Sequence, residues 1–186
     1  RGPPTTSAPT PMTEAPPTEE SGGNTEDDVD SGIGIPVYEL YGMTENGPVC
    51  CNPRWGITKQ GTTGLAYPGV ELRIVDPSDP DVDVPIGEIG ELLIRSPGNV
   101  SGYHNLPDVT RERLLDGGWL CSRDIARADE QGYIEIVGRE DDRISCAGES
   151  IYPKEVENVL MKHPDVADVA AVAMADDLKG EVPVAF

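Results

Sequence analysis

The hydrophobic pattern from residue 33 onward is typical of short β-strands. Apolar and polar side chains alternate over Val70–Ile74, and a second strand is predicted over Glu88–Arg95. Two further segments, Leu120–Ala126 and Tyr133–Val137, flank a turn that contains Gly132, and this arrangement predicts a β-hairpin. Residues 76–87, between the first two strands, predict an acidic, proline-rich loop.

Two helices are predicted. A short helix is predicted over Asp108–Leu115, and a second begins at Pro153, because proline suits the first turn of a helix. Val156, Val159 and Leu160 have the spacing of one helix face, and His163-Pro164 ends the segment. Strands are predicted over Val166–Met174 and Glu181–Phe186. The last 45 or so residues therefore predict an incomplete β-α-β-β unit, a small second domain hinged near Arg139–Asp142.

Residues 1–32 have a different composition. They consist mostly of Pro, Thr, Ser, Gly and acidic residues, with few large apolar side chains. Such a segment buries too little apolar surface to offset the entropy lost on ordering. We therefore predict a disordered tail.

The charge and the cysteines narrow the class of protein. The 186 residues include 34 acidic and 14 basic side chains, a net charge of -20 that argues against binding to nucleic acid or to an anionic membrane. No apolar run approaches the roughly 18 residues of a membrane helix, and no signal peptide is visible, so a cytoplasmic protein is expected. The four cysteines form no zinc-binding pattern, and free thiols are expected.

The segment Tyr41-Gly42-Met43-Thr44-Glu45 follows the apolar run Pro36–Tyr41. A strand that ends in a glycine-containing turn would bring an aromatic face, a hydroxyl and a carboxylate to one point. These groups suit stacking on a base, contact with a phosphate and binding of Mg²⁺. Taken alone, the segment equally fits a half-buried tyrosine and a solvated glutamate.

Asp124 lies on the first strand of the predicted hairpin, and Gly138–Arg143 follows the second strand. A carboxylate and an arginine on neighbouring strands can hold the hydroxyls of a sugar between them. The alternative is a cross-strand salt bridge, which contributes little stability at a surface.

Taken in order, these segments resemble the later core motifs of the adenylate-forming (AMP-binding) superfamily, which includes acyl-CoA synthetases, luciferases and the adenylation domains of peptide synthetases. The motifs are Tyr41–Glu45, Gly87–Leu92, Gly102–Asn105, Gly117–Leu120, Gly132-Tyr133, Gly138–Ile144 and Gly148–Glu157. The resemblance covers about residues 33–186. It implies an α/β protein with α+β character in this fragment: residues 33–139 as the β-rich C-terminal part of the large domain, and 140–186 as a truncated mobile domain hinged near Asp141.

The resemblance implies an ATP-dependent acid–thiol ligase of the acyl-CoA synthetase type. A carboxylic acid would attack the α-phosphate of ATP to form an acyl-adenylate, and coenzyme A would then displace AMP. In this family's pattern Tyr41 would stack on adenine, Gly42 would lie beside the nucleotide, Thr44 would contact the α-phosphate and Glu45 would bind Mg²⁺. Asp124 would bind the ribose hydroxyls.

Three further positions follow from the resemblance. Arg139 would also contact the nucleotide, and Asp141 would be the hinge about which the small domain rotates between the two half-reactions. Residues 145–148, which end at Gly148, would lie near the coenzyme A tunnel. Where the family commonly has Thr-Gly-Asp, this chain has Ser122-Arg123-Asp124.

Two parts of the family's catalytic machinery are expected outside this chain. The glycine-rich phosphate loop belongs upstream of Tyr41, and the C-terminal lysine belongs beyond Phe186. Gly61–Gly64 resembles such a loop only superficially, because a strand and not a helix follows it, and a turn is predicted. We therefore expect a fragment that is inactive alone. A peptide-synthetase-type adenylation domain and a noncatalytic nucleotide-binding module remain alternatives, and the acid and the oligomeric state are not predicted.

Salt should stabilise this chain if its acidity is an adaptation to a salt-rich cytoplasm. Only four of its residues are lysines, so the acidic surface repels itself at low ionic strength and salt would screen that repulsion. We expect the thermal unfolding midpoint to rise between 0.1 and 2 M potassium chloride. Equal midpoints would identify an ordinary acidic protein.

Overall fold

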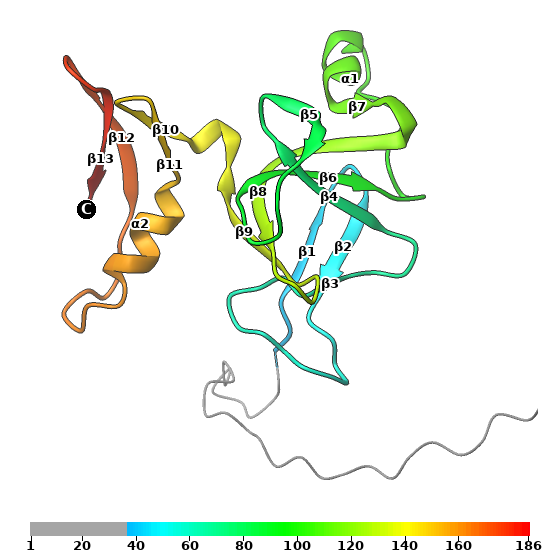
Figure 1. The fold of residues 1–186 in the computed structure, drawn as a ribbon, viewed down its shortest axis with the longest axis horizontal. Coiled ribbons are helices and arrows are strands. Elements are labelled where there is room, and N and C mark those ends of the chain that lie inside the picture. Colours follow the sequence, from blue (N-terminus) through cyan, green and yellow to red (C-terminus); the bar gives the residue numbers. More distant parts are fainter. Residues whose placement is uncertain (1–36) are drawn as a thin grey trace, which may run out of the picture. The chain divides into compact units, whose positions relative to one another are not determined.

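The computed structural model describes residues 37–186 (Figure 1). The predicted disordered tail, residues 1–32, lies outside the described residues. Within this described range, thirteen strands form three antiparallel sheets, and two α-helices accompany them. The β-rich character predicted for this region is confirmed.

The first sheet has the order β1-β2-β3. Its strands are β1 (Leu40–Met43), β2 (Gly47–Cys51) and β3 (Leu65–Ala66). The predicted turn begins later than expected, because Gly42 and Met43 continue β1 and the chain reverses only at Thr44–Asn46. The pairing of β1 with β2 shifts between Tyr41 and Gly42, which marks a bulge.

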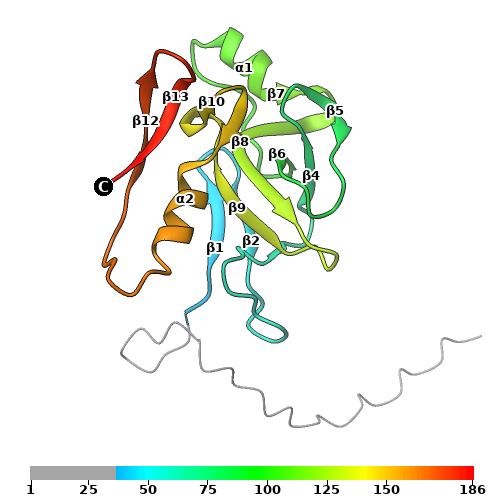
Figure 2. The same ribbon diagram turned by 60° about the vertical axis from the view of Figure 1, so that its left-hand side comes forward.

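The second sheet is the largest, with the order β5-β4-β6-β8-β7 and with β9 paired to β8 (Figure 2). Its strands are β4 (Glu71–Asp76), β5 (Asp79–Asp83), β6 (Gly90–Arg95), β7 (Leu114–Leu115), β8 (Trp119–Ala128) and β9 (Ile134–Arg139). The strands predicted around 70–74 and 88–95 and the hairpin around Gly132 are confirmed. The loop expected over residues 76–87 is wrong in part, because β5 pairs with β4 there.

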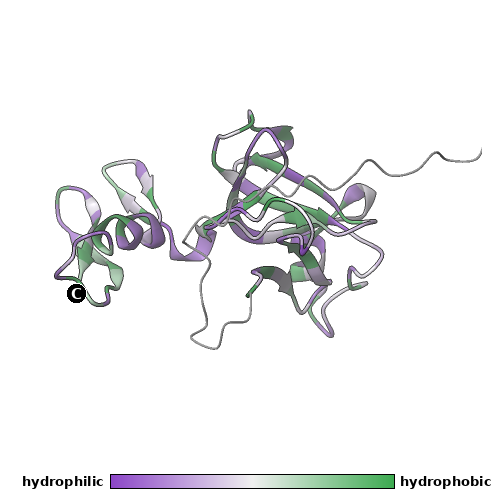
Figure 3. Cartoon of the chain, turned by 90° about the horizontal axis from the view of Figure 1, so that it is seen from below, coloured by the Kyte–Doolittle hydropathy of each residue, from purple (hydrophilic) through white to green (hydrophobic). Residues whose placement is uncertain are grey.

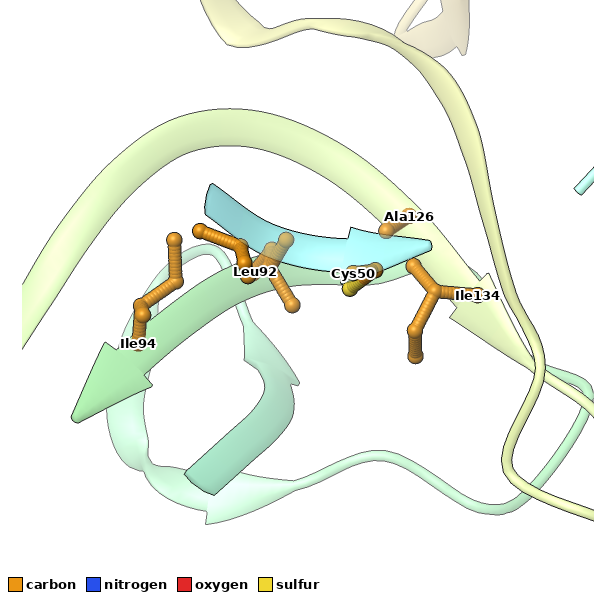
Figure 4. Packing of buried hydrophobic residues seen from close by; sticks show 6 residues of the cluster. Cys50, Leu92, Ile94, Ala126 and Ile134 are labelled. Atoms are coloured by element: carbon orange, nitrogen blue, oxygen red, sulfur yellow. The ribbon is translucent and has the colours of Figure 1, made fainter. Parts of the chain in front are cut away.

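The core is organised around β6, which lies between β4 and β8. Leu92 and Ile94 pack on one face with Val49, Cys50, Ala126 and Ile134 (Figure 4). Leu93 points to the opposite face, where it meets Val75 and Cys121. Both faces of β6 are covered, which explains why its central residues, Leu92–Ile94, are all apolar. In Figure 3 the hydrophobic segments lie mainly in the strands.

Both predicted α-helices are present, and each has proline in its first turn. Helix α1 spans Pro107–Arg113 and helix α2 spans Pro153–Leu160. The expected apolar face of α2 is only partly covered, because the Val159 side chain is 65% exposed. No helix among residues 37–186 has the length and apolar character that crossing a bilayer requires.

The C-terminal part forms the third sheet, with the order β11-β10-β13-β12. Its strands are β10 (Ile144–Cys146), β11 (Glu149–Ile151), β12 (Ala171–Asp176) and β13 (Gly180–Ala185). The strand predicted from Val166 begins only at Ala171. A 3₁₀ turn, η2 (Glu140–Asp142), connects β9 to β10. The Tyr152 side chain packs with Ile125 and Val137, so residues on both sides of η2 share a small core.

Gly42 is required by the close approach of β2. A Cβ atom at this position would lie 2.4 Å from the carbonyl oxygen of Gly47, far inside van der Waals contact. Gly42→Ala should therefore lower the free energy of unfolding by about 1–3 kcal/mol, as overpacking usually does. Gly47→Asn is the matched control, because nothing lies within 4 Å of a Cβ there and asparagine tolerates its φ of 74°. Urea unfolding measures both, and equal losses would contradict the steric explanation.

Candidate functional site

A buried carboxylate lies at the centre of the candidate site. Asp124 is only 6% exposed, and its Cα atom pairs directly with that of Arg139 across β8 and β9. Arg139 donates from Nε to Asp124 Oδ1 at 3.2 Å, and the Tyr41 hydroxyl donates to Oδ2 at 2.5 Å. The main-chain N–H of Asp124 donates to Ser122 Oγ at 3.0 Å. Three predicted site residues from three strands therefore meet.

The protonation of Tyr41 is fixed by its surroundings. Burial of the phenol raises its pKa far above the ordinary value of tyrosine, and the hydrogen bond to Asp124 raises this pKa further. The hydroxyl consequently stays protonated and keeps donating to Asp124. The cross-strand salt bridge considered for Asp124 and Arg139 is present. An ionised carboxylate has about four acceptor positions, so these two contacts leave Asp124 able to accept from a ligand.

Glu45 has a partner that the sequence analysis did not identify. The Tyr103 hydroxyl donates to Glu45 Oε1 at 2.9 Å, and burial together with this bond raises the pKa of Tyr103. The main-chain N–H of Val100 donates to the carbonyl oxygen of Glu45 at 2.8 Å. The loop before α1 therefore holds Glu45 in place. The motif Gly102–Asn105 was the available signal, although it gave no role to Tyr103.

A recess of about 360 Å³ brings the other predicted residues together. Thr44 and Glu45 line it from the turn after β1, and Arg139 and Asp141 line it from the end of β9 and from η2. The remaining lining residues are Gly42, Met43, Arg113, Ser122 and Arg123. Its titratable side chains comprise three arginines and two carboxylates, so guanidinium groups are available there to contact an anion.

A second recess, of about 720 Å³, is lined by Asp124, Arg139 and Asp141, and the last two also line the smaller recess. Gly138 and Lys154 are among its other lining residues. Gly148 does not line either recess. It lies in the turn between β10 and β11 with a φ of 89°, so the structure does not bring it to the other predicted residues.

Comparison with known proteins places this geometry in a family. Residues 17–104 match the family described as AMP-binding enzyme, and residues 155–186 match the AMP-binding enzyme C-terminal domain. The chain belongs to the AMP-binding enzyme family. The adenylate-forming resemblance of its motifs is thereby confirmed.

Related proteins in this AMP-binding family include several CoA ligases. A 2-succinylbenzoate–CoA ligase of Bacillus cereus is 41% identical over 155 residues, which are 82% of this chain and 31% of the relative. ATP-bound MatB from Rhodopseudomonas palustris superposes with a TM-score of 0.77 at 34% identity, over 82% of this chain and 30% of MatB.

The anthranilate CoA ligase AuaEII, solved in complex with anthranoyl-AMP, gives a TM-score of 0.72 at 32% identity, over 82% of this chain and 29% of AuaEII. The chain thus spans about a third of the length of the proteins that it matches.

The smaller recess is also lined by two arginines, Arg113 and Arg123, to which the sequence analysis gave no role. Arg113 donates to the carbonyl oxygens of Cys121 at 2.7 Å and Ser122 at 3.1 Å. Arg123, where the family commonly has glycine, pairs with Asp141 at 2.6 Å. Helix α1 therefore holds the strand segment that carries Asp124. The sequence signal for Arg123 was its departure from the family pattern.

Loss of the Tyr41 hydroxyl should destabilise the fold measurably. Tyr41→Phe leaves Asp124 with one fewer donor in a buried setting, so we expect the free energy of unfolding to fall by about 1–3 kcal/mol. Tyr38→Phe is the matched control, because Tyr38 is half-buried just before β1. Urea unfolding of both variants provides the measurement. A Tyr41→Phe midpoint equal to that of the control would contradict a stabilising role for this hydrogen bond.

Proposed function

We propose that this chain is part of an ATP-dependent acid–thiol ligase that forms an acyl-adenylate and then an acyl-CoA thioester. The observation that carries the proposal is the convergence of Tyr41, Asp124 and Arg139 beside the smaller recess, which Thr44 and Glu45 line together with Arg139. The CoA ligases among its relatives support the same reaction class. They do not favour the peptide-synthetase alternative or the noncatalytic module.

The nucleoside of ATP is proposed to bind at Asp124. Its carboxylate would accept hydrogen bonds from the two ribose hydroxyls, because Tyr41 and Arg139 leave acceptor positions free. The Tyr41 ring would stack on adenine while its hydroxyl stays bonded to Asp124, so one contact would orient both groups. Arg139 would contact the nucleotide from the edge of the same site, since its side chain is 65% exposed.

The phosphates are proposed to lie in the smaller recess. The exposed Thr44 hydroxyl would donate to the α-phosphate, and the guanidinium groups that line the recess would donate to phosphate oxygens. No cluster of three or more metal-binding side chains occurs within residues 37–186. Glu45 alone still fits a Mg²⁺ site, because this ion commonly takes one or two carboxylates together with phosphate oxygens and waters. Bound there, Mg²⁺ would neutralise charge on the phosphates.

The reaction would proceed in two displacements. An oxygen of the substrate carboxylate attacks the α-phosphorus, the bond to the leaving pyrophosphate breaks, and the acyl-adenylate forms. The sulfur of coenzyme A, with its proton removed, then attacks the acyl carbonyl, and the bond to AMP breaks. Asp141 is proposed to be the hinge that exchanges the groups facing these steps, and Gly148 to approach coenzyme A in the second.

The AMP affinity of the 186-residue chain tests the nucleoside site. Asp124→Asn keeps the shape of the side chain but replaces one acceptor oxygen by a donor, so we expect AMP binding to weaken about tenfold or more in calorimetric titration. Asp129→Asn is the matched control. Asp129 lies in the turn between β8 and β9, forms an ion pair with Lys59 and lines neither recess. Equal affinity of the two variants, or no saturable binding by the unaltered chain, would contradict the proposed site.

A further inference from the structure

Strand β8 bulges at the position where the family pattern has glycine. In the ladder between β6 and β8, Glu91 pairs with Ile125 and Leu93 pairs with Cys121. The single residue Leu92 of β6 therefore lies opposite three residues of β8, 122–124. The middle one, Arg123, has a φ of 65°, in the left-handed region that glycine enters most readily. Arg123 therefore carries a long side chain at a position whose backbone conformation favours glycine. Strained backbone and bulges of this kind occur preferentially at functional sites.

The bulge brings the Arg123 guanidinium to η2. Its Nη2 lies 2.6 Å from Asp141 Oδ1, with the two side chains 33% and 68% exposed. The guanidinium holds the pKa of Asp141 below its ordinary value, so the pair stays charged at neutral pH. Within residues 37–186, it is the one ion pair that joins residues up to 139 with residues from 140 onward.

We propose that Arg123 is a positioning residue that holds Asp141 and keeps η2 closed against β8. The inference rests on the proposed function for the role of Asp141 as a hinge. In that setting the pair acts as a latch, because rotation about Asp141 requires this ion pair to break. An enzyme with glycine at position 123 has no such latch.

The latch biases an equilibrium and does not lock it. Ion pairs at this exposure are weak. Loss of the Arg123–Asp141 pair should therefore raise the population of the open state, in which η2 has separated from β8, by about two- to fivefold. Other contacts across η2 remain, since Tyr152 packs with Ile125 and Val137, and Lys154 Nζ donates to the carbonyl oxygen of Ile136 at 3.1 Å. A modest effect confined to the connector is therefore expected.

Hydrogen–deuterium exchange of the 186-residue chain without nucleotide tests the latch. Arg123→Ala and Asp141→Asn should each speed amide exchange in peptides that cover residues 139–147 by about two- to fivefold. The double variant should match the single ones, because both remove the same interaction. Arg123→Lys should restore most of the protection. Unchanged exchange in Arg123→Ala, or additive effects in the double variant, would overturn the inference.

Arg123→Gly separates positioning from folding. It relieves the left-handed backbone, so its thermal midpoint should exceed that of Arg123→Ala, whereas its connector peptides should exchange as fast as those of Arg123→Ala. Peptides from β4 and β6 should stay unchanged in every variant. Uniform acceleration across the chain would show a merely structural role and overturn the proposal. The exchange experiment contains no nucleotide and does not depend on AMP binding. A failed AMP titration would therefore contradict the proposed function and leave the inference about Arg123 to be decided by exchange.

Discussion

The geometry of this site depends on keeping one carboxylate, that of Asp124, out of water. A charge buried this deeply requires strong donors, and the chain supplies a tyrosine hydroxyl and a guanidinium. The donors come from different places: Tyr41 belongs to the β1–β2–β3 sheet, and Arg139 to the strand beside Asp124. Satisfying the carboxylate therefore fixes β1 against β8 and β9. The same two contacts orient side chains that line the recesses. The stability of the fold and the arrangement of the candidate site therefore depend on the same interactions.

Irregular pairing surrounds this carboxylate. The ladders shift beside Tyr41, between Glu91 and Leu93, and beside Ile125. In a regular strand, neighbouring side chains point to opposite faces, so the side chains of Arg123 and Asp124 would lie on opposite faces of the sheet. A bulge relaxes that alternation and re-aims side chains. Here the core of β6 stays regular enough to bury both faces, whereas β8 deforms and presents charged groups toward the recesses.

Local patterns sufficed for most elements. The strand patterns of β6 and β8 and the proline at the start of α2 are decided within a few residues, and those predictions hold. Strand β5 was missed because its sequence has no apolar alternation, and its pairing is supported by the Arg73–Asp83 contact instead. The motifs identified Tyr41 and Asp124, but not the bond between them. Neither that bond nor the Tyr103–Glu45 contact could be predicted, because each joins residues more than 50 positions apart.

The backbone at position 123 gives a physical reason for the glycine that the family commonly has there. A φ of 65° costs a residue with a Cβ atom about 1–2 kcal/mol, so the bulge that serves Asp124 favours glycine on conformational grounds alone. An exposed ion pair returns a similar or smaller amount, so Arg123 brings no clear net gain in stability. What it does change is the partner of Asp141. In the proposed latch, a substitution that is close to neutral for folding and specific for one contact would alter the relative stability of two states of the connector, so its effect would concern conformational equilibrium more than the fold.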